Sequence, residues 1–274
     1  MQRRVIAIND ISSFGKCSLT VAVSIMSASG LELCALPTAV LSAHTGFKGY
    51  TFCDLTENIL PSARHWKDIG LTFDGIYTGY LGSKEQIERV LKVMDMFSVG
   101  VKLVDPVMGD DGVLYDGFTP DFPEEMKKLI KKADIIVPNV TESCLLTGSK
   151  YREEHSKEYI QELIGKLKEI TNAKIIITGI NSKYDKISTA VYDDGEILFI
   201  ENDKQQEAYS GTGDVFASTF MSAIMRGFSL TEAARISADF VGECIEITNK
   251  NTAGRHYGIN FELNTRSLLD KLDV

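Results

Sequence analysis

The residues best suited to chemistry lie at 210–214, where Ser-Gly-Thr-Gly-Asp opens a helix-like segment. Glycines let backbone N–H groups converge on a ligand because no Cβ stands in the way. A helix N-terminus adds free N–H donors and a positive dipole, which attract an anion. An aspartate beside such a site can accept a proton from an attacking hydroxyl. The stretch therefore predicts phosphoryl transfer with Asp214 as the base, and a helix cap is an equally good local interpretation.

Two other phosphate-binding patterns fit the chain poorly. A dinucleotide fingerprint at 211–216 would need a third glycine where Phe216 stands, and no clear strand precedes it. Residues 9–18 (NDISSFGKCS) place Gly-Lys between a strand-like run and a helix-like segment, as a P-loop does. Asp10 stands where a P-loop has its first glycine, and Cys17 where it has a hydroxyl for Mg²⁺. The P-loop interpretation is therefore excluded.

Strand-like and helix-like segments alternate along the whole chain and supply the scaffold for these residues. Strands are expected at 5–8, 33–42, 75–78, 101–104, 135–137 and 174–178, with a hairpin around 193–195. Helices are expected at 19–29, 55–69, 84–97, 124–132, 158–170, 214–225 and 230–249. The alternation predicts an α/β fold with a mostly parallel central sheet and helices on both faces. Because no repeat or linker-like segment interrupts it, we expect a single domain over residues 1–274.

Ligands of parallel sheets bind at the carboxyl ends of the strands, so the residues after each strand are candidates. These residues are polar or small, and they lie at 9–10, 42–46, 78–80, 105–110, 138–142 and 178–179. Turns favour such residues in any case. Their joint richness in Asp, Glu, Asn and Thr indicates a site more strongly than any one of them.

Composition narrows the class of protein. A net charge of −9 argues against a nonspecific nucleic-acid binder, which needs a basic surface. No apolar run approaches the ~18 residues of a membrane span, and the N-terminus lacks the pattern of a signal peptide. The five cysteines are scattered, which is typical of reduced core thiols. We therefore expect a cytoplasmic protein that acts on small molecules, without a nucleic-acid or membrane partner.

The sequence GTGD at 211–214, with DPVMGD at 105–110, PNVTE at 138–142 and SAHTG at 42–46, resembles the ribokinase-like superfamily of small-molecule kinases. SAHTGF, TGYLGS and DPVMGDDG, in that order, resemble the pyridoxal kinase branch, whose members phosphorylate vitamin B6. The resemblance covers nearly the whole chain. It implies the three-layer fold of that superfamily, ATP as co-substrate, Mg²⁺ and a homodimer, and it leaves open a monovalent cation such as K⁺.

The resemblance also implies roles for individual positions at the transfer and nucleotide sites. Asp214 would activate the 5′-hydroxyl of the substrate, and Gly211, Thr212 and Gly213 would form the anion hole for the phosphoryl group. The positions implied on the nucleotide side are Asp105 at the phosphates and metal, Asp110 nearby, Asn139 and Glu142 around Mg²⁺, Thr178 and Gly179 along the nucleotide, and Tyr115 over the phosphates. Mg²⁺ keeps several waters and needs only one or two carboxylates, which Asp105 and Glu142 could supply.

On the acceptor side, the resemblance implies that Thr45 contacts the pyridine ring and that Tyr80 lies close to it. Asp10 departs from the family pattern, which has a serine at this position. A carboxylate there could accept hydrogen bonds from a ring N–H or from an amine, so we expect Asp10 to favour aminated acceptors. An Asx-turn is the alternative interpretation of Asp10.

Two other functions stay open at this point. The same fold could carry a hydroxymethylpyrimidine kinase of thiamine synthesis. The chain could also be a non-catalytic protein that binds a nucleotide or a vitamin, although Asp214 argues against this because binding alone requires no base.

Overall fold

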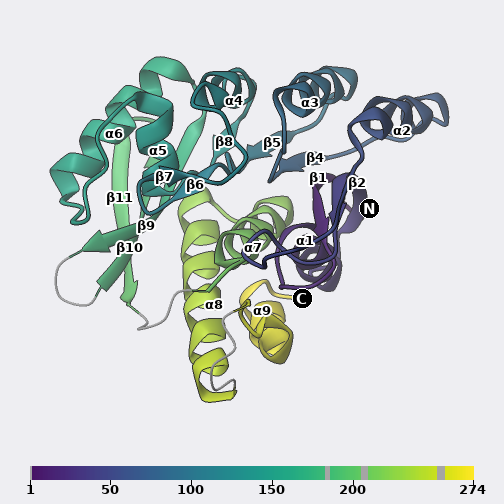
Figure 1. The fold of residues 1–274 in the computed structure, drawn as a ribbon. Helices are drawn as coiled ribbons and strands as arrows, with labels where there is room; N and C mark the ends of the chain where they lie inside the picture. Colours follow the sequence, from purple (N-terminus) through teal and green to yellow (C-terminus); the bar gives the residue numbers. More distant parts are fainter. Residues whose placement is uncertain (1, 183–185, 205–208, 252–256) are drawn as a thin grey trace.

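The computed structural model describes residues 2–182, 186–204, 209–251 and 257–274. Within these residues the chain forms a nine-stranded sheet in the order β11-β10-β9-β8-β5-β4-β1-β2-β3 (Figure 1). The strands are β1 Arg4–Ser12, β2 Glu32–Leu41, β3 Phe52–Asp54, β4 Gly75–Thr78, β5 Val101–Val104, β8 Ile135–Ile136, β9 Lys174–Ser182, β10 Lys186–Asp193 and β11 Glu196–Asp203. β3, β10 and β11 pair antiparallel at the two edges, and the other strands pair parallel. The expected mostly parallel sheet is confirmed.

Helices cover both faces of the sheet and complete three layers (Figure 1). One layer contains α2 Thr56–Asp68, α3 Lys84–Met96, α4 Phe122–Ile130, α5 Val140–Thr147 and α6 Lys157–Ile170. The other contains α1 Ser18–Ala28, α7 Thr212–Arg226, α8 Leu230–Asn251 and α9 Thr265–Lys271, the last preceded by a 3₁₀ turn at Phe261–Asn264. A small hairpin of β6 Gly109–Asp110 and β7 Val113–Leu114 lies outside the main sheet.

The central strand β1 shows why the strands read as continuous apolar runs. Its side chains alternate between the two faces, so Ile6 and Ile8 pack into one core while Val5 and Ala7 pack into the other. All four are fully buried. Burying an Ile or Val side chain stabilises the fold by roughly 1.5–3 kcal/mol. Both helical layers are therefore held to the sheet through the same short segment.

The topology places a ligand crevice at the carboxyl end of β1. The chain passes from β1 to β2 on one side and later returns to β4 on the other side. In open α/β sheets, such a reversal of strand order leaves a gap between the outgoing connections, and ligands bind there. This rule makes the carboxyl-terminal half of β1, which contains Asn9 and Asp10, the expected place for a ligand.

Three local expectations were wrong. Thr178 and Gly179 do not follow the sixth expected strand but lie within it, because β9 extends from Lys174 to Ser182. Asn9 and Asp10 do not follow the first strand but belong to it, because β1 continues to pair with β2 as far as Ser12, with an irregularity between Asn9 and Ile11. Helix α5 was not expected, although Asn139 and Glu142 form a capping box at its start. An Asn followed three residues later by Glu before apolar residues is a helix-start pattern, which we had interpreted only as a strand end.

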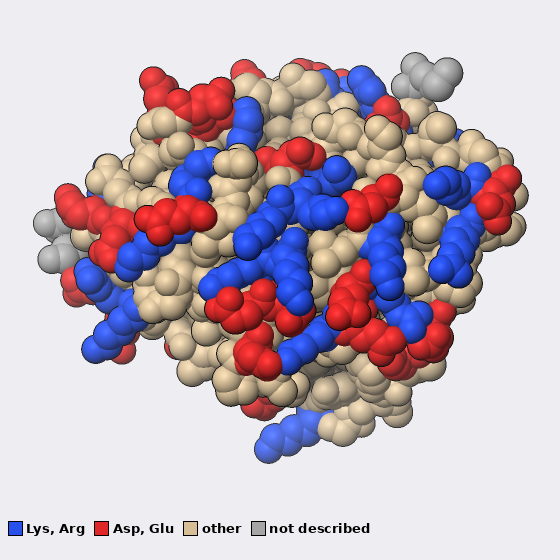
Figure 2. Space-filling model, turned by 90° about the horizontal axis from the view of Figure 1, so that it is seen from above, with Lys and Arg blue, Asp and Glu red and all other residues tan. Residues whose placement is uncertain are grey.

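Charged side chains of both signs are intermixed on the face formed by α2–α6 (Figure 2). They pair between neighbouring elements, as in Lys132 with Asp95 and Lys84 with Asp121. Exposed pairs of this kind contribute about 0–1 kcal/mol each. The charges of this face therefore largely offset one another. No helix among the described residues is long and apolar enough to cross a membrane.

Candidate active site

Backbone hydrogen bonds align the strand ends into one edge. The N–H of Gly79 donates to the carbonyl of Ile8 at 2.9 Å, and the N–H of Asp105 donates to that of Thr78 at 2.9 Å. The same pattern continues to β9, where the N–H of Thr178 donates to the carbonyl of Pro138 at 3.0 Å. The polar residues that the sequence scattered along the chain are therefore brought to a common edge of the sheet.

Gly211 is the N-cap of α7, and its conformation requires a glycine. Its φ is +79°, in the left-handed region, and a Cβ would lie 2.1 Å from the carbonyl oxygen of Lys16. Thr212 and Gly213 form the first turn, and Gly213 is exposed. The first N–H groups of a helix have no partner within it. The three predicted anion-hole residues therefore form an N-terminus able to bind an anion.

Asp214 is partly buried at this N-terminus and turns toward β1. Its Oδ1 accepts a hydrogen bond from Asn9 Nδ2 at 3.3 Å. Burial raises the pKa of Asp214 to about 6, the charge of Asp10 adds to this, and the Ser18 backbone N–H and the Asn9 amide oppose it. No side-chain hydrogen bond caps α7. Gly211 occupies the N-cap position, so Asp214 stands in the first turn of α7 and not at the cap itself.

The loop between β1 and α1 reaches Asp214 in a strained conformation. Lys16 and Ser18 have φ values of +54° and +58°, and each left-handed non-glycine residue costs about 1–2 kcal/mol. Lys16 is held by Asn260 and Glu262 near the C-terminus, at 2.6 and 2.9 Å. Such strain persists only where surrounding contacts impose it. Here it places the backbone N–H of Ser18 beside the carboxylate of Asp214.

The acceptor side combines a buried carboxylate with a phenol. Asp10 is only 3% exposed, and its Oδ2 accepts a hydrogen bond from Ser12 Oγ at 2.8 Å. Burial raises the pKa of Asp10, and the hydroxyls of Ser18 and Ser12 oppose this. Burial and the nearby Asp10 raise the pKa of Tyr80 to about 12. Tyr80 therefore stays protonated at neutral pH and can donate a hydrogen bond.

Thr45 lies in the loop after β2, where it is exposed. This loop joins the β1–α1 loop through the His44 N–H, which donates to the carbonyl of Phe14 at 3.0 Å. The rings of Phe14 and Phe47 also lie 5.4 Å apart. The two loops thus form a continuous wall, on which Thr45 lies toward solvent.

Asp105 and Glu142 are buried carboxylates close enough to repel each other. Burial, then the charges of Glu142 and Asp214, raise the pKa of Asp105 well above its usual value, and no hydrogen bond from a described residue offsets them. The Glu142 oxygens accept hydrogen bonds from the N–H groups of Met108 at 3.2 Å and Asn139 at 2.8 Å. Burial nevertheless raises the pKa of Glu142 to about 8.

These two carboxylates fit a divalent cation. A bound cation would favour the ionised form of both carboxyls, against the burial that raises the pKa of each. Among the described residues, no group of three or more acidic, His or Cys side chains forms a metal cage. Mg²⁺ does not need one, because it keeps several waters and binds substrate phosphates. Asp105 and Glu142 would hold such a Mg²⁺, and the Glu142 oxygens keep accepting capacity beside their backbone hydrogen bonds.

The remaining predicted nucleotide-side residues surround this pair. Both ends of the Asn139 side-chain amide bond to the protein itself. Its Oδ1 accepts a hydrogen bond from the Glu142 N–H at 2.8 Å, and its Nδ2 donates to the Gly109 carbonyl at 2.9 Å. It also forms a parallel bridge with Thr178. Gly179, with a φ of +68°, is exposed beside it. Asn139 therefore positions Glu142 and the β6–β7 hairpin.

Two predicted residues come from the β6–β7 hairpin and the turn after it. Asp110 is exposed, and its Oδ1 accepts a hydrogen bond from the Asp111 N–H at 3.0 Å. Tyr115 is 39% exposed, and its N–H donates to the carbonyl of Met108 at 2.9 Å. Burial and the charge of Glu142 raise the pKa of Tyr115. The hairpin therefore borders the two carboxylates.

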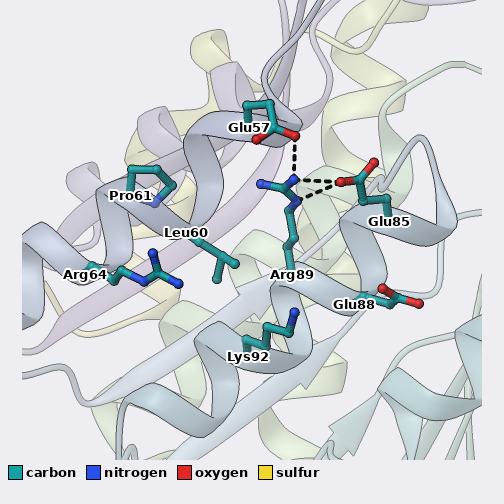
Figure 3. A pocket seen from close by; sticks show the side chains of 8 residues that line it. All are labelled: Glu57, Leu60, Pro61, Arg64, Glu85, Glu88, Arg89 and Lys92. Carbon is teal, nitrogen blue, oxygen red and sulfur yellow. Dashed lines mark hydrogen bonds and ion pairs between the residues drawn. The ribbon is translucent and has the colours of Figure 1, made fainter.

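A surface groove between α2 and α3 lies outside this site (Figure 3). Its lining residues are Glu57, Leu60, Pro61, Arg64, Glu85, Glu88, Arg89 and Lys92. Arg89 donates to Glu57 at 2.5 Å and to Glu85 at 2.6 Å. None of the predicted site residues lines this groove, so we assign it no part in the reaction.

Comparison with known proteins identifies the family. A family model described as phosphomethylpyrimidine kinase matches residues 62–260. A Bacteroides thetaiotaomicron structure that carries the same name and was solved with pyridoxal has a TM-score of 0.92, with 34% identity over 100% of this chain and 96% of that one. The structure of pyridoxal kinase from Lactobacillus plantarum has a TM-score of 0.91 and is 28% identical, over 98% of this chain and 97% of that one. The pyridoxal kinase PdxY of Actinobacillus succinogenes is 26% identical over 264 residues, 90% of each chain.

The fold and the site at the carboxyl edge define an α/β kinase of the ribokinase-like type, as the sequence motifs implied. The chain belongs to the phosphomethylpyrimidine kinase family, whose model matches most of its length. The expected resemblance to the pyridoxal kinase branch is also confirmed.

Proposed function

We propose that this chain is an ATP-dependent kinase that phosphorylates the 5′-hydroxyl of a vitamin B6 vitamer, pyridoxal, pyridoxamine or pyridoxine. The observation that carries the proposal is the position of Asp214. Its carboxylate has a pKa of about 6 and lies in the first turn of α7, beside unpartnered backbone N–H groups. Such a group is mostly ionised at neutral pH and is basic enough to accept a proton from an alcohol in the transition state.

The reaction that these residues support is a direct transfer. Asp214 accepts the proton of the acceptor hydroxyl as its oxygen bonds to the γ-phosphorus of ATP and the bond to the β-phosphate oxygen breaks. The N–H groups of Gly211, Thr212 and Gly213 hold the negative charge of the transferring group. Asp105 and Glu142 would hold a Mg²⁺ ion, which would supply charge neutralisation of the phosphates. The protein mainly positions the reactants.

The acceptor would lie against β1 and the end of β4. Asp10 and Tyr80 present one acceptor and one donor there, and Thr45 borders them from the neighbouring loop. On the other side, Asp110, Tyr115, Asn139, Thr178 and Gly179 would border ATP. The solved relative that contains pyridoxal supports a pyridine as the acceptor.

A hydroxymethylpyrimidine kinase is the second candidate, and the name of the matching family favours it. Both acceptors are planar nitrogen heterocycles with a hydroxymethyl group, so one site can serve either. Turnover with each B6 vitamer and with hydroxymethylpyrimidine, measured under the same ATP concentration, separates the two. A kcat/KM highest for hydroxymethylpyrimidine would replace our proposal with this one.

The Asp214→Asn variant tests the catalytic assignment. We expect kcat to fall by roughly 10²–10⁴, because the amide cannot accept the proton. ATP affinity should stay nearly constant, since the N–H groups and the metal site remain. Asp270→Asn, on the exposed surface of α9, is the matched control. An Asp214→Asn variant as active as the control would refute both the base and the enzyme mechanism.

We further infer that the protein acts in the cytoplasm as a homodimer with one site in each subunit, and that K⁺ could assist ATP binding. The resemblance supports the homodimer and the ion, and the scattered cysteines support the cytoplasm. Light scattering of the purified protein checks the assembly, with twice the mass of one chain expected. Activity in K⁺ compared with a bulky organic cation checks the ion.

A further inference from the structure

Asn9 is a polar residue in the middle of the molecule, and it is fully buried. Its side-chain Oδ1 accepts two backbone hydrogen bonds, from the N–H of Asp10 at 2.9 Å and from the N–H of Tyr80 at 2.8 Å. One of these donors is in β1 itself and the other follows β4. The amide therefore ties the central strand to the segment that borders the acceptor.

These two donors decide which way the amide points. An NH₂ group cannot face two N–H groups, so the oxygen must face Asp10 and Tyr80. The nitrogen must then face the opposite direction, where Nδ2 lies 3.3 Å from Asp214 Oδ1. The orientation follows from the hydrogen-bond network and not from a free choice between the two amide rotamers.

Gly79 leaves the space that this arrangement needs. A Cβ on residue 79 would lie 2.2 Å from Asn9 Nδ2, which no packed structure tolerates. The absence of a side chain there lets the Asn9 amide lie flat between β4 and α7. Three segments far apart in the sequence thus meet around one amide.

We infer that Asn9 is a positioning residue, which holds the carboxylate of Asp214 in its reactive orientation and couples it to the acceptor-binding segment at Tyr80. The inference rests on the proposed kinase function. We assign Asn9 no direct contact with the substrate, because its side chain is fully buried and its amide bonds to Asp10, Tyr80 and Asp214. Its effect on the reaction must pass through Asp214.

The surroundings of Asp214 make this donor important. Five titratable groups interact electrostatically with Asp214. They are Asp10 from β1, Cys17 before α1, Tyr77 from β4, Asp105 after β5 and Tyr115 after β7. All are acidic, so every one of them disfavours the ionised form of Asp214 when itself ionised. Asn9 and the Ser18 N–H are the groups that favour it. Loss of Asn9 should therefore shift Asp214 toward its protonated form.

Two variants test the inference. Asn9→Ala removes the whole amide, whereas Asn9→Asp keeps an oxygen for the Asp10 and Tyr80 N–H groups and loses the NH₂ donor. We expect both to lower kcat by about 10- to 100-fold, the usual value of a hydrogen bond to a charged group. We also expect the acid limb of the kcat–pH profile to move to higher pH in both. The KM for ATP should change less than twofold.

Thr219→Val is the matched control, because Thr219 is as buried as Asn9 and its hydroxyl has no hydrogen-bond partner among the described residues. It should keep the kcat and the pH limb of the wild type. Asn9 variants that fold, bind ATP and retain both the wild-type kcat and the wild-type acid limb would overturn the inference. Failure of both variants to fold would assign Asn9 a structural role and overturn it too.

The kinase proposal is judged separately. If the wild-type protein transfers no phosphoryl group to a B6 vitamer or to hydroxymethylpyrimidine, the proposed function fails first. If the wild type is active and Asp214→Asn is not, a normal pH profile in Asn9→Asp removes only the positioning role.

Discussion

The neighbours of Asp214 bring the pKa of its carboxyl group close to neutral pH. Burial and the charge of Asp10 raise its pKa, while Asn9 and Ser18 limit the rise to a value of about 6. An ordinary Asp, with a pKa near 3.9, would be a weaker base. A much higher value would leave it protonated in the cell. The useful value results from opposing effects of neighbouring residues.

This balance predicts a pH dependence. The base form of Asp214 is present above its pKa and is lost below it, so kcat should rise with pH through a midpoint near 6 and then level off. The measurement is kcat between pH 5 and 8 with saturating substrates. Activity recovered after return from pH 5 to pH 7.5 controls for unfolding. A flat profile over this range contradicts the role of Asp214.

Asp10 should determine the choice of acceptor. Its buried carboxylate keeps accepting capacity beyond the bond from Ser12, which suits an ammonium group better than an aldehyde. In Asp10→Ser we expect kcat/KM for pyridoxamine, relative to pyridoxal, to fall by about 10- to 100-fold. Asp10→Asn keeps the shape and removes the charge, so it should show the same direction. If the ratio of kcat/KM for pyridoxamine to that for pyridoxal is unchanged in both variants, Asp10 does not determine the choice of acceptor.

At the scale of elements, the start of α7 is held in place by the loop before α1. Gly211 touches the carbonyl of Lys16 so closely that no side chain fits between them. The same loop carries Ser18, whose N–H faces Asp214. One contact between two helix N-termini therefore positions both the first turn of α7 and Asp214.

Gly211→Ala should break that contact. We expect it to lower both the free energy of unfolding, by at least the 1–2 kcal/mol of a left-handed alanine, and kcat, by more than tenfold. Gly227→Ala is the control at the other end of α7, because Gly227 has a φ of +96° but open space around its Cβ. It should lose stability to a similar degree and keep its kcat. Urea unfolding and steady-state kinetics measure the two effects. Equal kcat values for Gly211→Ala and Gly227→Ala would contradict the expectation.

At the scale of the whole molecule, a chain of net charge −9 has to bind an anionic nucleotide. The carboxyls of Asp105 and Glu142 would repel the phosphates when ionised, and burial raises the pKa of both groups. A cation that binds ATP and these groups together resolves the repulsion. We therefore expect the affinity of the protein for ATP to depend on Mg²⁺.

Thermal unfolding tests this dependence. Mg²⁺–ATP at 100 times its dissociation constant should stabilise the folded protein by about 2.7 kcal/mol, seen as a higher Tm. ATP with EDTA should give a much smaller increase, and Mg²⁺ alone is the control. The Asp105→Asn variant should respond less to Mg²⁺–ATP. An equal Tm increase with EDTA would exclude a metal-dependent site.

Local sequence patterns determined most of the architecture. The apolar runs at 135–137 and 174–178 predicted strands buried on both faces, as the strands of a parallel sheet are. The motif at 211–214 located the helix N-terminus, since glycines and a first-turn Asp act within a few residues. The roles of the individual site residues and the single domain stay predictions.

Only the tertiary structure decided how the site is assembled. Asn9 and Asp214 are 205 positions apart, and no local periodicity records that they share a hydrogen bond. The strained conformation of Ser18 likewise depends on contacts made by Lys16 with the C-terminal segment. Local propensities arise from neighbours in the chain, whereas these groups became neighbours through the packing of β1 against α7. The pKa of Asp214 is therefore a property of the fold.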